Sequence, residues 1–523
     1  MEALRTDVAI IGGGLGGCAA ALAAARLGRR VILTEETCWI GGQLTSEAVP
    51  PDEHRWIEEF GAPASYRALR RGIRDYYRAH TPLTPEARAR PDLNPGNGWV
   101  SRLCHDPRIA VAVLHQMLAP YLLVGRVTLL HARRPASATV DGDRVRAVVL
   151  RDVETGCECC VEAPLFIDAT PVGDLLAVAG VEHVIGAEAR SETGEPHAAE
   201  QADGRAQQAT TFCFALEYLS GEDHTIDKPP RYGFWRELRP PGWPGRLLGW
   251  TTERPETHEP LTRHLFHAED GRPLWRFRRI LDRANFAEGF APSDVTLVNW
   301  PQHDYRLGPI LGVGDEERAR NLEDARQLSL SLLYWLQTEA PRPDGGVGYP
   351  GLRLRADVVG ATRDGLAPAP YIRESRRLRA EFTVLEQHIA YPLRPRGPEL
   401  FGDSVGVGCY RIDLHPSVGG AGYLDLGCWP FQIPLGAMIP VRVENVLPGG
   451  KNLGVTHVTN GAFRVHPVEW SVGEAAGILG AFCLERKVTP RSVRNTPSLL
   501  EELQAVLRRQ GVELSWPPSL EPV

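Results

Sequence analysis

Four polar side chains near the C-terminal end of the chain could move a proton and hold an anion. They are His457, Asn460, Arg464 and His466. Imidazole is the side chain best suited to take a proton near neutral pH, and a guanidinium binds anions through parallel hydrogen bonds. We predict that His457 and His466 are acid/base residues and that Arg464 and Asn460 bind substrate. A histidine with satisfied hydrogen bonds in the core is the alternative for each histidine.

A second polar group lies in the proline-rich and aromatic middle of the chain. It comprises Asn299, Gln302, His303, Asp304 and Tyr305. Such side chains could orient a polar substrate, and we predict substrate contacts for Asn299 and His303. A loop whose side chains hydrogen-bond to its own backbone is the alternative.

A glycine-rich turn near the N-terminus predicts a dinucleotide site. Gly12, Gly14 and Gly17 form the pattern G-x-G-x-x-G between the β-branched run 7–11 and the alanine-rich segment 18–27, with Gly16 inside it. The first glycine allows a tight turn, the second admits a diphosphate, and the third lets the helix pack on the strand. The helix N-terminus adds free N–H groups.

A second strand-like run, residues 30–34, ends at Glu35. An acidic residue at that place would accept hydrogen bonds from ribose hydroxyl groups. Glu36 follows, and then a glycine pair that includes Gly42, before Gln43. A glycine pair at this distance is typical of flavoproteins.

The first fifty residues resemble the FAD-dependent oxidoreductase family of the glutathione-reductase-like superfamily, which also contains the fumarate reductase flavoproteins. The resemblance implies FAD as the cofactor and an α/β fold, a Rossmann-like FAD-binding domain with an inserted α+β substrate domain. The cofactor contacts that it implies here are Gly12, Gly14, Gly16, Gly17, Glu35, Glu36, Gly42 and Gln43.

Three later segments resemble the same family. Residues 165–170 resemble the family's strand before an A-T-G-x-G-D turn, which implies cofactor contacts at Asp168 and Ala169. In the turn itself, Pro171 and Val172 differ from the family pattern, whereas Asp174 matches it. Residues 371–378 resemble an R-E-[ST]-R-R segment, which places Arg373 near substrate. Residues 451–477 resemble the closing motif, with cofactor contacts at Gly454 and Gly473. The helix predicted over 468–484 would direct its N-terminus at the flavin.

These elements predict a discontinuous domain organisation. Residues 1–180 form the first part of the FAD-binding domain, with a β-meander over 125–165 built from strands 127–130 and 145–150. Residues 181–440 form the substrate domain, which includes a helix over 316–336 whose apolar residues recur at threes and fours. Residues 441–490 return to the FAD-binding domain, and residues 491–523 form a C-terminal helical tail.

Composition excludes several classes of function. The chain has 523 residues, and 58 Lys and Arg against 65 Asp and Glu give a net charge of −7. Such a chain lacks the positive field that binding to nucleic acid or an anionic membrane needs, so neither partner is expected. The three lysines and many arginines indicate a GC-rich bacterial genome. We interpret the arginine stripe on 67–78 as a solvated helix face.

Cysteine usage favours a cytoplasmic setting. Ten cysteines in a long chain do not predict a disulfide framework. Cys157, Cys159 and Cys160 are close enough to bind zinc, but no second pair completes a tetrahedral site. A hairpin on the solvent side is the preferred interpretation, and no metal is expected.

Three motifs of other flavoprotein classes are missing, and their absence limits the reactions that we predict. The sequence has no second glycine-rich βαβ unit, no C-x-x-x-x-C pair and no G-D-A-A-H type motif. We predict a dehydrogenase or oxidase that takes hydride from a C–H bond next to O or N of a small polar substrate, with O2 or a separate redox partner as the final acceptor. The alternatives are a reductase of an activated C=C bond and a non-catalytic FAD-binding protein.

Overall fold

A five-stranded parallel sheet forms the centre of the computed structural model, which describes residues 3–518 and 520–523. Its strands run in the order β21-β8-β2-β3-β4, and every neighbouring pair is parallel. Their bounds are Val8–Ile11 for β2, Val31–Thr34 for β3, Val127–Leu130 for β4, Leu165–Asp168 for β8 and Val446–Pro448 for β21. Short, buried, β-branched strands are typical of a parallel sheet covered on both faces. The predicted α/β fold with a Rossmann-like domain is confirmed.

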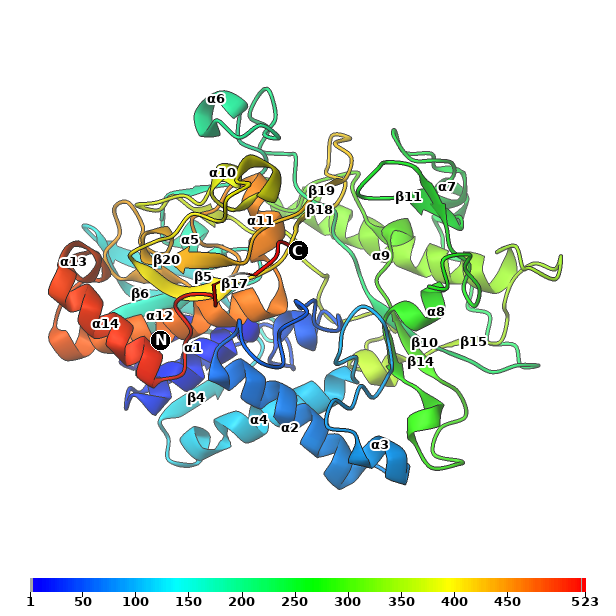
Figure 1. Ribbon diagram of the computed structural model, residues 1–523, viewed down its shortest axis with the longest axis horizontal. Helices are drawn as coiled ribbons and strands as arrows, with labels where there is room; N and C mark the ends of the chain where they lie inside the picture. The colour runs from blue at the N-terminus through cyan, green and yellow to red at the C-terminus, as the bar shows by residue number, and fades with distance from the viewer. Residues whose placement is uncertain (1–2, 519) are drawn as a thin grey trace.

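Helices cover one face of this sheet. α1 (Leu15–Arg26) packs along α12 (His466–Arg486), and Figure 1 shows the blue helix beside the orange one. α2 (Ala64–His80) and α4 (Pro107–Leu123) lie next to them. Val8 and Ile10 of β2 share their hydrophobic cluster, as expected because alternate residues of a strand face opposite sides.

A second sheet covers the other face. It has the order β1-β7-β6-β5 and packs on Ala9 and Ile11. Its strands are Ala3–Arg5 (β1), Arg133–Asp141 (β5), Arg144–Asp152 (β6) and Glu158–Glu162 (β7). The expected place of residues 127–130 in this meander is wrong. That strand is β4, which pairs in parallel with β3 at the edge of the central sheet.

The middle of the chain builds a separate antiparallel sheet with the order β13-β14-β10-β15, seen at the right of Figure 1. The long helix α9 (Asp315–Thr338) packs against it through an aromatic-rich core. The sheet strands are Phe214–Tyr218 (β10), Arg279–Leu281 (β13), Val295–Val298 (β14) and Leu352–Leu354 (β15). Around them lie α7 (Tyr232–Glu237), β11 (Thr251–Glu253), β12 (Pro260–Thr262) and α8 (Leu274–Phe277).

The remaining elements close the molecule around α12. β17 (Ser404–Gly408) pairs with β20 (Phe431–Pro434) and packs on α12, and β18 (Ile412–Leu414) pairs with β19 (Leu424–Leu426) beside α11 (His457–Phe463). β16 (Arg377–Leu378) pairs with β9 (His183–Val184). The other helices are Pro85–Ala89 (α3), Asp174–Val178 (α5), Arg190–Thr193 (α6), Glu386–Ile389 (α10), Pro490–Asn495 (α13) and Pro497–Arg509 (α14).

Neither a membrane-spanning helix nor a metal-binding cluster is present in the described residues. Within residues 3–518 and 520–523, no helix is both long and apolar enough to cross a bilayer. In the same residues, no group of three or more His, Cys, Asp or Glu side chains is arranged to hold a metal ion. Cys159 and Cys160 lie on β7, Cys157 precedes it, and all three are free.

Candidate active site

The glycine turn before α1 lines a narrow cleft. Gly12 has φ of +105°, and a Cβ there would lie 2.3 Å from the carbonyl oxygen of Ala169. Gly14 is the N-cap residue of α1 and supplies no side-chain cap. A Cβ on Gly42 would lie 3.0 Å from the Gly14 Cα. A Cβ on Gly12 or Gly42 would collide with neighbouring backbone, and with Gly14 these glycines give the cleft one wall of bare backbone, the surface that a diphosphate needs.

Other glycines of the two motifs serve packing. A Cβ on Gly16 would lie 1.7 Å from the Gly449 carbonyl oxygen, and one on Gly17 would lie 2.0 Å from that of Gly12. A Cβ on Gly473 would lie 2.0 Å from the Gly16 carbonyl oxygen, where α12 crosses α1. The structure therefore gives Gly16, Gly17 and Gly473 a role in close backbone contact rather than in lining the cleft.

Glu35 and Glu36 stand at the end of β3 and line the cleft. Glu35 accepts hydrogen bonds from the Gly13 N–H (3.1 Å) and from the N–H and hydroxyl of Thr37 (both 2.8 Å). Burial raises the pKa of Glu35 to about 7 and also raises that of Glu36. The cleft opens past Glu36 into a cavity of about 590 Å³.

The turn after β8 reaches the cleft through Thr170, Pro171 and Asp174. The Asp168 carboxylate instead accepts from the backbone N–H groups of Thr170 (3.0 Å) and Leu176 (2.9 Å). It stabilises the turn, and the predicted cofactor contact of Asp168 is replaced by this internal role. Ala169 packs against Gly12.

Two more predicted cofactor residues are inside the protein. A Cβ on Gly454 would lie 2.6 Å from Ala380 Cβ, and Gly454 does not line the cleft. Gln43 is 1% exposed; its amide nitrogen donates to the Arg464 carbonyl oxygen (3.0 Å) and to the Glu469 carboxylate. Gln43 therefore ties the loop after the glycine pair to the start of α12.

The cleft residues fit a dinucleotide. Three lining glycines leave backbone exposed to the diphosphate, and Arg134 adds positive charge beside the turn, whereas the neighbouring Arg133 is paired with Asp152. The adjoining cavity offers apolar surface from Phe212, Ile310 and Pro370 for an aromatic ring.

A short extended segment separates this cleft from a second cavity of about 240 Å³. Ile372 lines the cavity that continues the cleft, whereas Tyr371 and Arg373, its two neighbours, line the second cavity. Alternate residues of an extended chain point to opposite sides. Residues 371–373 are thus a shared wall between the cofactor side and the second cavity.

The second cavity collects three of the predicted substrate residues. Arg373, Arg464 and Asn299 all line it. The Arg464 guanidinium donates to the Tyr371 hydroxyl (3.0 Å) and the Asp413 carboxylate (2.7 Å). The Asn460 amide lies behind the wall and donates to the Arg373 carbonyl oxygen (2.8 Å). Asn460 therefore positions Arg373 and does not itself line the cavity.

The predicted histidines do not line this cavity. His466 is fully buried and its ring nitrogens contact the Asp52 N–H (3.1 Å) and the Val49 carbonyl oxygen (3.2 Å). Burial lowers the pKa of His466 to about 4. His303 is also fully buried; it accepts from the Trp300 N–H (3.0 Å), and burial lowers its pKa to about 3. Nδ1 of His457 lies 3.0 Å from the Glu374 carboxylate.

A histidine that sequence reasoning missed does line the second cavity. Nδ1 of His415 lies 2.6 Å from Oδ2 of Asp304, and its Nε2 lies 3.9 Å from the Asp413 carboxylate. Burial lowers the pKa of His415, with a further contribution from Arg373. Neutral His415 therefore donates its Nδ1 proton to Asp304 and keeps Nε2 as a base. No local motif marks His415, because Asp304 lies 111 residues away.

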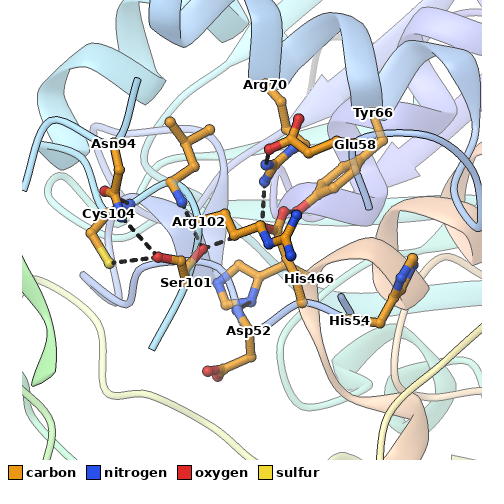
Figure 2. Close-up of polar contacts among 12 residues, drawn as sticks. Asp52, His54, Glu58, Tyr66, Arg70, Asn94, Ser101, Arg102, Cys104 and His466 are labelled. Carbon is orange, nitrogen blue, oxygen red and sulfur yellow. Dashed lines mark hydrogen bonds and ion pairs between the residues drawn. The ribbon is translucent and has the colours of Figure 1, made fainter. Parts of the chain in front are cut away.

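The loop that carries Asp52 into the cavity is anchored by buried charges. Arg70 pairs with Glu53 and Glu58, and Arg74 pairs with Glu58 at 2.6 Å. Figure 2 shows Arg70 and Glu58 together above Ser101, with the Asp52 carboxylate pointing away from them. The expectation of a solvated arginine face is wrong for Arg70 and Arg74, which are 2% and 4% exposed, because acidic residues of the preceding loop cover them.

Comparison with known proteins shows which family the chain belongs to. The chain matches the family described as FAD dependent oxidoreductase over residues 7–507, and no curated protein matches it. It is similar to the solved structure of the myxobacterial chondrochloren halogenase CndH, at 14% identity over 97% of this chain and 80% of that one, with a TM-score of 0.33.

Two further solved structures show similarity. A geranylgeranyl bacteriochlorophyll reductase-like protein from Thermoplasma acidophilum is 11% identical over 98% of this chain and 85% of that one, with a TM-score of 0.34. L-proline dehydrogenase from P. horikoshii is 16% identical over 32% of this chain, with a TM-score of 0.19, and the matched part spans only 23% of that chain.

Proposed function

The chain belongs to the FAD dependent oxidoreductase family, and we propose that it removes a hydride from a C–H bond next to O or N of a small polar substrate in the second cavity. It is an enzyme whose cofactor is FAD. The observation that carries the proposal is the His415–Asp304 pair at a cavity that shares the segment 371–373 as a wall with the cavity that continues the cofactor cleft.

The cleft residues have assigned roles in this proposal. The backbone at Gly12, Gly14 and Gly42 would hold the diphosphate, and Glu35 would accept from the ribose. When bound, FAD supplies a two-electron acceptor for a hydride. The Gln43–Arg464 hydrogen bond joins the cofactor loop to the substrate cavity.

The substrate cavity supplies the proton chemistry. His415 takes the proton of the substrate O–H or N–H at Nε2, while Asp304 holds the Nδ1 proton and the ring orientation. A general base acts within hydrogen-bonding reach and must be unprotonated, which the lowered pKa of His415 ensures at neutral pH. Arg373 and Arg464 line the cavity, and their pairing with Asp304 and Asp413 fixes its shape beside the substrate. We also propose that O2 or a separate redox partner takes the electrons onward.

The test is anaerobic mixing of the FAD-loaded protein with a panel of alcohols, amines, hydroxy acids and amino acids. At least one should bleach the flavin absorbance, and air or an artificial electron acceptor should restore it. If none does, while flavin reduced by an artificial donor is reoxidised by an enoate, the reaction runs in the opposite direction and the reductase alternative replaces this one. A protein that binds no FAD would contradict the proposal and the family assignment together.

A further inference from the structure

Arg278 and Asp52 form a buried pair of opposite charges without a hydrogen bond between them. Nη1 of Arg278 lies 3.6 Å from Oδ1 of Asp52, which is beyond hydrogen-bonding distance. The two residues are 8% and 6% exposed, and both line the second cavity. Nε and Nη1 of Arg278 are buried without an acceptor in the described part of the chain.

The remaining arginines of this cavity differ from Arg278. Arg373 lies 2.9 Å from Asp304, Arg464 lies 2.7 Å from Asp413, Arg263 lies 2.7 Å from Asp270, and Arg411 contacts the Asp425 carboxylate. Each of them is neutralised by a hydrogen-bonded acid. Nε of Arg373 and Nε of Arg464 are also buried without an acceptor, but among the lining arginines of the described chain Arg278 is the one whose guanidinium has no hydrogen-bonded acid.

The position of Asp52 is set by its backbone and its neighbours. Its N–H donates to Nδ1 of His466 (3.1 Å), and Glu53, the next residue, contacts the Arg70 guanidinium, the Tyr66 hydroxyl (2.7 Å) and the Ser101 hydroxyl (3.2 Å). In Figure 2, the Asp52 carboxylate points away from Tyr66, Arg70 and Ser101. The anchoring leaves the carboxylate itself free to accept hydrogen bonds.

A second free donor lies on the neighbouring strand end. The Leu297 N–H donates to the Arg278 carbonyl oxygen (3.0 Å), which brings Asn299 to the same side of the cavity. Oδ1 of Asn299 accepts from Arg373 (3.4 Å), and its Nδ2 is buried without an acceptor among the described residues. Burying a charged or polar group costs free energy unless the group has hydrogen-bond partners. A ligand with both charges would find donors on Arg278 and Asn299 and an acceptor on Asp52.

We propose that the second cavity binds a zwitterion of the amino-acid type, whose carboxylate pairs with Arg278 and Asn299 and whose ammonium group donates to Asp52. That this ligand is the substrate rests on the proposed function. Its α-carbon lies between the two charged groups. If that carbon lost a hydride, which bound FAD would accept, and the ammonium group lost one proton to Nε2 of His415, the C–N bond would become a C=N iminium bond, with both electrons and both hydrogen atoms accounted for.

The test measures binding to the FAD-loaded protein under anaerobic conditions, where no acceptor reoxidises the flavin and each site reacts at most once. The melting temperature Tm is followed against the concentration of glycine, alanine, acetate and methylammonium. Because a ligand of the native state raises Tm with concentration, glycine or alanine should raise Tm progressively, with the logarithm of its concentration above Kd. Acetate and methylammonium should bind at least about tenfold more weakly, because acetate can pair only with Arg278 and methylammonium only with Asp52.

Substitutions of Arg278 and Asp52 test whether these two residues contact the amino acid. Arg278→Met and Asp52→Asn should each weaken amino-acid binding by at least about tenfold, whereas Arg411→Met, which removes an arginine already paired with Asp425, should change it by less than about threefold. Arg278→Lys, which keeps the charge, guards against loss of folding. Equal binding of acetate and alanine, no Tm response to amino acids, or an unaffected Arg278→Met protein would overturn the proposal.

The outcomes separate this inference from the proposed function. If amino acids bind but no amino acid bleaches the flavin, the ligand class stands and the proposed reaction fails. If neutral alcohols bleach the flavin while no amino acid binds, the reaction stands and the ligand class fails.

Discussion

Nδ1 of His415 lies 2.6 Å from Oδ2 of Asp304 at the wall of the substrate cavity. The same carboxylate lies 2.9 Å from the Arg373 guanidinium. Burial acts to raise the pKa of Asp304, but Arg373 and His415 hold it well below its usual range. Asp304 is therefore a fixed anion that can keep the proton of His415 on Nδ1 and the lone pair of Nε2 toward the substrate.

The first prediction concerns His415 itself. Because a positioned general base contributes about 10²–10⁴-fold to a rate, His415→Gln should slow flavin reduction by that factor and leave FAD content unchanged. Rapid mixing under anaerobic conditions measures the reduction rate. His388→Gln, on α10, is the matched control and should stay near the unmodified rate. The assignment is wrong if His457→Gln abolishes reduction and His415→Gln does not.

The second prediction concerns pH. His415 must be neutral to act, and burial places its pKa below the ordinary imidazole value. We expect kcat/KM to be constant at and above neutral pH and to fall as the pH drops through that lowered pKa. Asp304 opposes the lowering, so Asp304→Asn should move the acid limb to still lower pH besides reducing the rate. An acid limb above the ordinary imidazole pKa of about 6.5 would contradict this assignment.

The third prediction tests the crossing of α1 and α12. A Cβ on Gly473 would lie 2.0 Å from the Gly16 carbonyl oxygen, so Gly473→Ala forces the helices apart. Overpacking typically costs about 1–3 kcal/mol, and we expect a lower Tm and a lower FAD content. Gly233→Ala on α7 is the control, since nothing lies within 4 Å of the place that its Cβ would take. Equal Tm values for the two variants would contradict a tight contact between α1 and α12 at Gly473.

The fourth prediction concerns the buried arginine of α2. Removing one partner of a buried ion pair costs about 3–5 kcal/mol because the other charge is left without compensation. Arg70→Met should destabilise the protein by about that amount in denaturant unfolding. Arg71→Met, at the adjacent exposed position, should change stability by less than about 0.5 kcal/mol. A small effect at Arg70 would show that water reaches the Glu53 and Glu58 carboxylates.

The fifth prediction concerns Glu47. Burial raises the pKa of Glu47 to about 7 from 4.5, so the folded protein binds a proton that the unfolded chain releases. Stability from this group is complete below pH 4.5 and is lost as the pH rises to about 7. At about 1.4 kcal/mol per pKa unit, the loss is about 3 kcal/mol. Glu47→Gln should flatten the fall of apoprotein stability between these pH values, followed by denaturant unfolding.

The sequence predicted the elements that local pattern determines. The glycine turn, the strands at 8–11 and 31–34, and the closing helix were found because buried strands and tightly packed helices restrict residue type over short spans. Placing residues 127–130 was harder. A four-residue apolar strand fits the edge of a parallel sheet as well as a meander, and only pairing with β3 decides between them.

The substrate cavity was predicted in part. Arg373, Arg464 and Asn299 meet there, whereas His303 and His466 satisfy their rings on nearby backbone groups. His415 and Asp52 could not be found from spacing, because their partners come from elements far along the chain. A titratable residue shows its role only when the fold supplies the group that orients it.

The contact of α1 with α12 also affects how the protein is made. Gly16 and Glu469 meet across 453 residues of chain, and β21 completes the central sheet at Val446–Pro448. During translation, the N-terminal strands and the small-residue face of α1 emerge long before the segments that cover them. The nascent chain therefore carries an uncovered apolar surface until residues 446–486 have been synthesised, and such a surface is prone to aggregation unless a chaperone binds it.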